Sequence, residues 1–544
     1  MDMEKRLNRK VGKDEKILLM LAPFWAPLIP PLGSSCIKSH IKQHGYINIT
    51  IADANLETRL WEMNTRYLRR LETFIPEEKK GNFNMVAYDV FMNHLMAHLN
   101  HEDEITYINL ISIIINVNFF VSINAEKIRE LNQIITDFYS LYSEYVLELI
   151  KKEKPAVLGI TVYSLTLAPS VFTFKLAKEN FPGIMTVMGG GVFADQLDTM
   201  SPNFGTFLDK CSFIDKIIVG EGEELFLKLL KGELPGEKKV YTLEDINYQV
   251  MDLSFAGIPD YSDLELEGYT QLCSYTSRSC PYQCSFCSET VQWGKYRKKQ
   301  AKKVADELIL LKRMYGRSLF LLGDSLINPV IDELALEMYT RDKKIYWDAY
   351  LRADKPVCNP ENTRLWRNGG FYRARLGIES GSQNVLNLMN KKITPDQIKQ
   401  ALQSLALAGI KTTTYWVIGH PGETETDFRQ TLEILEECRD SIYEADWHPF
   451  YFFPAGQTNS TGWRNENRIR LLYPEEATDL LITQTWTLET KPERSEIYDR
   501  LCRFADHCRV LGIPNPYSLR DIYLADERWK HLQKNAVPAL VELS

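Results

Sequence analysis

The sequence predicts an α/β protein built from two parallel sheets and a helical C-terminal region. Three observations support this prediction. The chain has 544 residues, too many for a single hydrophobic core. Residues 1–240 alternate between apolar strand-like runs and amphipathic helical segments, the order of a doubly wound, Rossmann-like sheet. A second alternation with six candidate strands follows and predicts a partial (β/α)6 barrel.

The first alternation begins with the continuous apolar run 16–24, as expected for a strand buried on both faces. An amphipathic helix then ends near Gly45, and 47–55 is the second strand. A long, aromatic-rich helical pattern at about 56–148 interrupts this alternation of strands and helices and is expected to be an insertion. The strands resume at 156–166, at 184–191 and from 215.

Four regions follow from these patterns. Residues 1–240 form the first α/β domain, and 241–264, with weak periodicity and several Pro and Gly residues, form a linker. Residues 265–470 form the partial barrel, and 471–544 form a helical cap. The expected barrel strands lie at 269–277, 318–325, 345–354, 372–380, 410–419 and 447–455.

Composition limits the class of protein. The net charge is -8, which argues against a nucleic-acid partner. The N-terminal segment lacks the apolar core and cleavage site of a signal peptide, so we expect a cytoplasmic protein with reduced thiols. The apolar segment 107–124 carries Asn109, Asn116 and Asn118, whose amides are costly in lipid. We therefore expect a buried helix or strand there, and no membrane span.

Small and glycine-rich turns follow three strands of the first domain. They are the Ser164–Thr166 turn, Gly189–Gly191 and the turn that starts at Gly220. Glycine lets a backbone approach a ligand closely, and parallel sheets bind ligands at the carboxyl ends of their strands. One such turn is explained by local geometry alone, whereas three at one edge indicate a ligand.

Cys280, Cys284 and Cys287 form a C-x3-C-x2-C set on a polar loop after the first barrel strand. A cubane iron–sulfur cluster normally takes four thiolates, so three leave one iron open, as a catalytic metal site requires. A zinc site would need a partner pair of cysteines, and none is well placed. The other cysteines fit packing better; they are Cys36, Cys211, Cys273, Cys358, Cys438, Cys502 and Cys508.

This loop resembles that of the radical S-adenosylmethionine (SAM) superfamily. "LLGDS" (321–325) resembles the motif near the SAM amino group, with Asp324 where glutamate is usual, and "GIESGSQ" (377–383) resembles the ribose motif. "GHPGET" (419–424) resembles the turn after the fifth strand, and the resemblance covers about 265–470. It implies a 4Fe-4S cluster on the three cysteines. The SAM-side residues that it implies are Phe286, Gly323, Asp324, Arg352, Glu379 and Ser380.

Residues 1–240 resemble the cobalamin-binding domain fused to one branch, the class B radical SAM methyltransferases. The D-x-H-x-x-G motif of domains that bind cobalt through histidine is absent, so no histidine is expected below the cobalt and Tyr163 is a candidate to face it. The implied cobalamin-side residues are Leu32, Gly33, Tyr163, Ser164, Thr166, Gly189, Gly190, Gly191, Gly220, Glu221 and Gly222.

The resemblance implies a C-methyltransferase that moves a methyl group from SAM through methylcobalamin to an unactivated carbon. The expected substrate is a natural-product or peptide intermediate, and the expected electron donor is an external flavodoxin or ferredoxin. Ring contraction and oxidative cyclisation remain open alternatives. A methylthiotransferase is rejected because 1–240 hold only two cysteines, and a cobalamin carrier needs no open iron. Substrate-side candidates near the strand ends are Tyr415, Trp416, His420, His448 and Tyr451.

Overall fold

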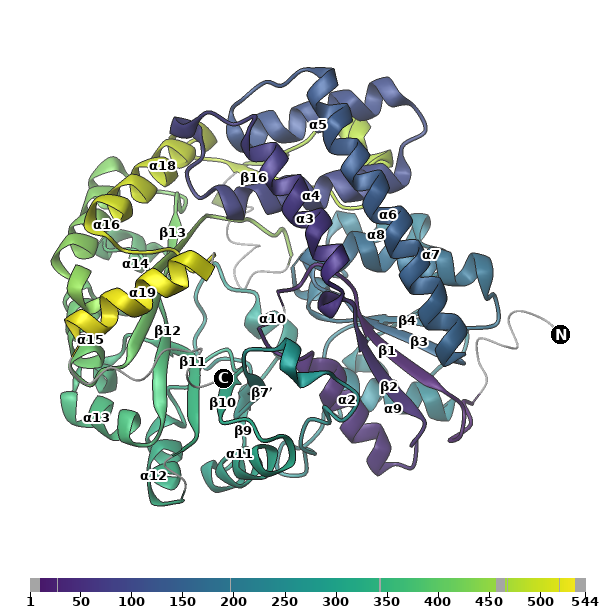
Figure 1. The fold of residues 1–544 in the computed structure, drawn as a ribbon, viewed down its shortest axis with the longest axis horizontal. Helices are drawn as coiled ribbons and strands as arrows, with labels where there is room; N and C mark the ends of the chain where they lie inside the picture. The colour runs from purple at the N-terminus through teal and green to yellow at the C-terminus, as the bar shows by residue number, and fades with distance from the viewer. Residues whose placement is uncertain are drawn as a thin grey trace.

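The computed structural model describes residues 10–26, 28–195, 197–341, 344–455, 465–466, 468–517 and 519–533. Two six-stranded parallel sheets lie side by side, with the short helix α10 (Glu289–Trp293) between them (Figure 1). The predicted α/β class, with its Rossmann-like sheet, partial barrel and helical regions, is confirmed.

The first sheet has the strand order β2-β1-β3-β4-β5-β6. Its helices cover both faces. Ile17 and Leu19 of β1 pack in one apolar cluster with α2 (Leu32–Gln43) and α9 (Gly222–Lys231). Leu18 and Met20 pack on the other side, with α7 (Leu167–Asn180) among others. The strands are β1 (Ile17–Leu21), β2 (Ile49–Asp53), β3 (Val157–Thr161), β4 (Met185–Gly189), β5 (Lys216–Ile218) and β6 (Val240–Tyr241).

A group of helices separates β2 from β3 and lies above the first sheet (Figure 1). The apolar segment around 107–124 forms α5, buried among its neighbours. Of its asparagines, Asn109 and Asn116 are exposed, whereas Asn118 is buried and its amide donates to the carbonyl of Ile114. None of the described helices combines the length and apolar character that a membrane crossing needs. The group consists of α3 (Thr58–Glu72), α4 (Phe83–Asn100), α5 (Glu104–Phe119) and α6 (Ala125–Glu153).

The second sheet has the order β14-β13-β12-β11-β10-β7, in which each strand lies beside its predecessor in the series. Its strands are β7 (Leu272–Ser274), β10 (Leu319–Leu322), β11 (Tyr346–Arg352), β12 (Phe371–Glu379), β13 (Lys411–Ile418) and β14 (Glu444–Pro449). The intervening helices are α11 (Ala301–Tyr315), α12 (Ile331–Arg341), α13 (Pro360–Asn368), α14 (Gln383–Leu388), α15 (Pro395–Leu407) and α16 (Glu425–Glu437).

The C-terminal region is not entirely helical. An antiparallel hairpin of β15 (Arg468–Leu471) and β16 (Trp486–Glu489) precedes α18 (Arg494–Leu511) and α19 (Leu519–Leu532). Four residues are too few to show a strand period, so the helical expectation missed this hairpin. The last part of the expected cap, 534–544, lies outside the described residues.

Candidate functional site

A pocket of about 230 Å³ lies at the carboxyl edge of the first sheet, where this edge faces the barrel. We call it the glycine pocket. Among the residues that line it are Leu32, Gly33, Tyr163, Gly189, Gly190, Gly191, Gly220 and Gly222, all expected from the sequence to lie beside a ligand. From the barrel side, Tyr275, Arg278, Trp293 and Gly323 also line it. Two of the three turns, at Gly189–Gly191 and at Gly220, therefore meet here together with Tyr163, and the pocket is shared with the second sheet.

Gly190 shows why glycine is needed in this wall. Its φ is +119°, a conformation that side chains disfavour. A Cβ atom there would lie 2.4 Å from the carbonyl oxygen of Val162. At the next position, a Cβ on Gly191 would lie 3.1 Å from Cδ1 of Tyr163. The backbone thus comes close to the Tyr163 loop and forms a thin wall.

Tyr163 is clamped between this wall and Trp25. The two rings stack with centroids 4.4 Å apart, and burial raises the pKa of the phenol to about 12. The hydroxyl therefore stays protonated at neutral pH.

Three of the expected cobalamin-side residues do not line the glycine pocket. Thr166 is fully buried and its hydroxyl accepts the Tyr163 amide, so it shapes the turn. Ser164 points the other way and donates to Asp195. Glu221 is buried in ion pairs with Arg278 and Arg297.

These ion pairs attach the barrel to the first sheet. Arg278 lies on β8 (Ser277–Arg278) and Arg297 on β9 (Arg297–Lys298), two short antiparallel strands. The Arg278 guanidinium pairs with Glu221 at 2.9 Å and with Glu223. Burial alone would raise the pKa of Glu223, but Arg278 outweighs it and the net pKa is lowered. We call the cluster of Arg278, Arg297, Glu221 and Glu223 the arginine latch.

The segment between β8 and β9 carries the three cysteines, and we call residues 279–296 the cysteine loop. Cys280, Cys284 and Cys287 are half-buried and form no disulfide bond within the described part of the chain. On the barrel side the loop is fixed by the Ser285 amide, which donates to the Met389 carbonyl at 3.0 Å, and by the Asn390 amide, which donates to the Gln283 carbonyl.

The cysteine set fits a cluster better than a single ion. In the described part of the chain, no three His, Cys, Asp or Glu side chains converge on one metal position. A cubane cluster does not require such convergence, because each thiolate binds its own iron. Burial raises the pKa of Cys287 to about 12, so without a metal this thiol stays protonated. Coordination to iron would remove that proton.

Several expected SAM-side residues surround the cysteine loop. The Arg352 guanidinium lies 4.1 Å above the Tyr282 ring and 3.8 Å from Sγ of Cys284. Glu379 has a φ of +69° and pairs with Lys391 at 2.6 Å. The Lys391 ammonium also lies 5.7 Å from the ring centre of Phe286. Phe286, Arg352 and Glu379 thus come together around the cysteines.

The other three expected SAM-side residues do not gather around the cysteines. Asp324 is buried and accepts from the Thr276 and Ser277 amides and from the Thr276 hydroxyl; burial raises its pKa to about 6. This carboxyl holds the β7–β8 connection and does not face an open site. Ser380 is fully buried, with its hydroxyl 3.2 Å from that of Thr431. Gly323 lines the glycine pocket.

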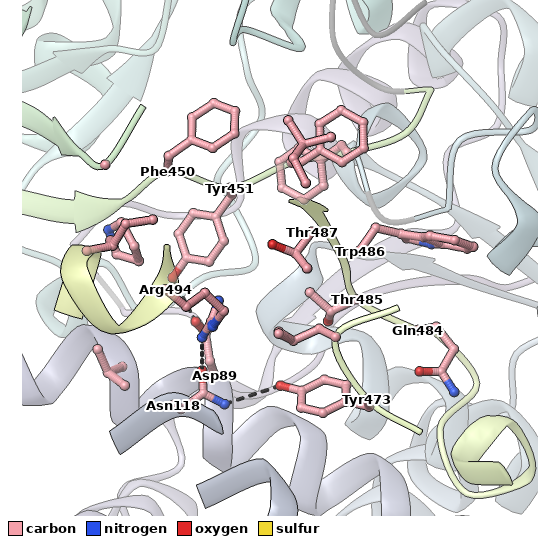
Figure 2. A pocket seen from close by; sticks show the side chains of 18 of the residues that line it. Asp89, Asn118, Phe450, Tyr451, Tyr473, Gln484, Thr485, Trp486, Thr487 and Arg494 are labelled. Carbon is pink, nitrogen blue, oxygen red and sulfur yellow. Dashed lines mark hydrogen bonds between the residues drawn. The ribbon is translucent and has the colours of Figure 1, made fainter. Parts of the chain in front are cut away.

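A second and larger pocket, about 770 Å³, lies beside the first and is named here the aromatic chamber. Its walls come from α4, the ends of β13 and β14, the β15–β16 hairpin and the start of α18 (Figure 2). Ser164 and Leu165 line it, directly after Tyr163 of the glycine pocket. Phe450 also lines it and packs in the same apolar cluster as Phe286 of the cysteine loop. The chamber therefore adjoins both other sites.

Of the five substrate-side candidates, Tyr451 lines the chamber, and His420 and His448 lie directly beside residues that line it. Tyr451 lines the chamber and donates to Asp89 at 2.7 Å, and His448 stacks on its ring at 6.0 Å. His420 packs edge-on against Phe450, and burial lowers its pKa to about 4.

Trp416 and Tyr415 do not line the chamber. Trp416 is fully buried against Phe504 with its indole N–H bonded to Thr414, which corrects the expectation that it meets substrate. Tyr415 packs on Tyr350 and accepts from Arg375.

Sequence reasoning missed several residues of these sites. Arg278 stands two positions before Cys280, so its place on the motif loop was a usable signal. Asp89 and Arg494 carried no such signal, because their partners come from distant segments: the Arg494 side chain meets Asn118, 376 residues away. Lys391 lies 12 residues after its partner Glu379 but outside the motif that pointed to Glu379.

Comparison with known proteins agrees with this geometry. Residues 274–435 match the family model described as the radical SAM superfamily. An anaerobic magnesium-protoporphyrin IX monomethyl ester cyclase from Rubrivivax gelatinosus is 28% identical over 58% of this chain and 60% of its own length. The cobalamin-dependent radical SAM methyltransferase TokK from Streptomyces tokunonensis is 23% identical over 52% of this chain and 45% of its own length. The chain thus spans about half to three fifths of these relatives.

One solved structure matches nearly end to end. The radical SAM methyltransferase TsrM from Kitasatospora setae, solved with cobalamin and a [4Fe-4S] cluster bound, has a TM-score of 0.59 at 14% identity over 96% of this chain and 97% of its own. Residues 274–435 thus form a radical SAM domain. The fold of the chain as a whole is similar to that of TsrM.

Proposed function

We propose that the chain is a cobalamin-dependent radical SAM C-methyltransferase, which transfers a methyl group to an unactivated carbon of a natural-product or peptide substrate. The observation that carries this proposal is the shared boundary of the three sites. The glycine pocket adjoins the aromatic chamber at Tyr163–Leu165, and the cysteine loop adjoins the chamber through the apolar cluster on which Phe286 and Phe450 both pack.

The residues present fit both cofactors. The glycine pocket, at about 230 Å³, suits part of a cobalamin, such as its nucleotide tail, against the thin wall at Gly190 and Gly191. The three thiols of the cysteine loop would hold a 4Fe-4S cluster with one iron open for SAM. When bound, these groups supply the radical and methyl-transfer chemistry.

The side chains of the protein would position the cofactors and the substrate and would shield them from water. Arg352 stands beside Cys284, where its guanidinium would pair with a carboxylate. Lys391 pairs with the Glu379 carboxylate and thereby orients this side chain. The aromatic walls of the chamber exclude water and limit side reactions of a reactive carbon centre.

A second outcome is supported by the relatives. The relative named above at 28% identity is a cyclase, and two further cyclases of the same name are 26% and 25% identical. Oxidative cyclisation with the same cofactors is therefore the alternative function.

The test uses anaerobically reconstituted protein, a chemical reductant and SAM labelled with deuterium in its methyl group. The substrate source is a small-molecule extract of cells that carry the gene. Methylation predicts a product that gains one labelled methyl group in mass spectrometry. Cyclisation predicts a product that has lost hydrogens and carries no label, and formation of neither product contradicts both functions.

A further inference from the structure

We propose that the aromatic chamber binds a substrate with a flat apolar body and a carboxylate, and that Arg494 receives the carboxylate. This deepens the function proposed above and rests on it for the identity of the chamber as the substrate site. The argument depends on how Arg494 is held, on what its neighbours leave unpaired, and on where it lies relative to the cysteine loop.

Arg494 is fixed along one edge only. Its Nη2 donates to the carbonyl of Val117 at 3.1 Å and to Oδ1 of Asn118 at 3.4 Å. Asn118 is itself immobilised, since its amide donates to Ile114 and to the Tyr473 hydroxyl at 3.2 Å. The guanidinium is therefore preorganised against the end of α5, which lowers the entropy cost of binding a ligand.

The rest of the guanidinium has no partner within the described part of the chain. Nε of Arg494 is buried and makes no hydrogen bond, and the guanidinium forms no ion pair with a carboxylate. A half-buried cation with an unbonded, buried N–H is costly, and a planar carboxylate is the group that matches the guanidinium fork. The charge and shape of the missing partner are thus defined by the arginine.

The remaining charges of the chamber do not compete for this role. Lys491 pairs with Glu493 at 2.8 Å, and Arg470 is exposed on β15. Asp89 lines the same wall and is near enough for the Arg494 charge to lower its pKa, but burial outweighs this and raises the pKa to about 6, and the carboxyl accepts from the Tyr451 hydroxyl instead of forming an ion pair with Arg494. Arg494 is therefore the half-buried cation to which an incoming anion would be drawn.

The body of the ligand is defined by the aromatic side chains. Figure 2 shows Phe450 at one end of the drawn residues, Asn118 and Tyr473 at the other, Arg494 between them below Tyr451, and Trp486 along the side. Buried aromatic rings favour flat apolar groups that can stack on them. Phe450 packs on the same apolar cluster as Phe286 of the cysteine loop, so a ligand whose carboxylate reaches Arg494 would direct its apolar body toward that loop.

The probe is 1-pyrenebutyrate, a fluorescent flat carboxylate, with its methyl ester as the uncharged match. Binding to the full-length, reconstituted protein is followed by fluorescence titration, which needs no turnover. We expect the acid to bind at least about tenfold more tightly than the ester. Arg494→Gln should remove that preference and leave ester binding unchanged, whereas the matched control Arg470→Gln should preserve it.

Two results would overturn the proposal: equal binding of acid and ester by the wild type, or a preference that survives in Arg494→Gln. Inorganic phosphate serves as the competitor. Displacement of the acid by millimolar phosphate would show a general oxyanion site and contradict a carboxylate-specific one. Iron and cobalt are measured on the same samples, so that loss of the cofactors, which would contradict the proposed function, is distinguished from failure of the anion site.

Discussion

Replacing Arg278 by Met breaks the arginine latch and is expected to release the cysteine loop from the first sheet. The guanidinium pairs with Glu221 and Glu223 and is 7% exposed, while the two acids are 3% and 5% exposed. Methionine approximates the length of the side chain and removes its charge. Glu223 would then stay buried without a cation, while Glu221 would keep Arg297.

The magnitude follows from that uncompensated charge. Removing one partner of a buried ion pair costs about 3–5 kcal/mol. A free-energy change of about 1.4 kcal/mol corresponds to a factor of ten in an equilibrium constant. The lower value, about 3 kcal/mol, therefore corresponds to roughly a 100-fold increase in the equilibrium constant for local opening. Because β8 leads directly into the cysteine loop, the opening should extend through 277–298.

Hydrogen exchange measured by mass spectrometry on peptides that cover 277–298 provides the assay. The matched control is Arg500→Met, which breaks another buried pair, with Glu423 at 2.9 Å, on α18. The control should speed exchange in α18 and leave 277–298 unchanged. If Arg278→Met leaves exchange of 277–298 within about threefold of the wild type, the reasoning is refuted, because a broken buried pair predicts roughly 100-fold.

Three further predictions concern the sites themselves. Cys284→Ser should lower bound iron to near zero in a colorimetric iron assay, whereas Cys358→Ser, on a half-buried thiol outside the loop, should keep it; full iron in Cys284→Ser would contradict the ligand assignment. Gly190→Ala places a Cβ 2.4 Å from the Val162 carbonyl and should abolish cobalt retention in gel filtration, while Gly183→Ala, with open space around it, should not. Because the pKa of Glu223 is lowered in the fold, the stabilisation from the latch is present above its ordinary pKa of 4.5 and lost as pH falls below it. Exchange of 277–298, corrected for its intrinsic pH dependence, should therefore accelerate between pH 5 and about pH 3, and no acceleration would refute this role of Glu223.

Local patterns were enough to predict the two sheets. β1 reads as one apolar run because both of its faces are covered, by α2 and α9 on one side and by helices such as α7 on the other. The glycine turns were recognisable because each follows a strand, and parallel strands bring their carboxyl ends to one edge. Gly190 in particular cannot be replaced without a clash with the Val162 backbone.

The chamber could not be predicted in the same way. Its walls join α4 to β14, to a hairpin of four-residue strands and to α18, and no local periodicity encodes contacts between such distant segments. The role of Asp324 was obscured for another reason. Its motif position suggested a ligand contact, whereas its carboxyl is engaged by two backbone amides and the Thr276 hydroxyl.

The central claim is that the glycine pocket and the cysteine loop hold two different metal cofactors in one chain. Metal analysis of the protein, reconstituted anaerobically with iron, sulfide and hydroxocobalamin and then gel-filtered, tests this most directly. The account predicts about four irons and about one cobalt per chain, with iron lost in Cys284→Ser and cobalt lost in Gly190→Ala. Four irons without cobalt would contradict the assignment of the glycine pocket, and absence of iron would contradict the account as a whole.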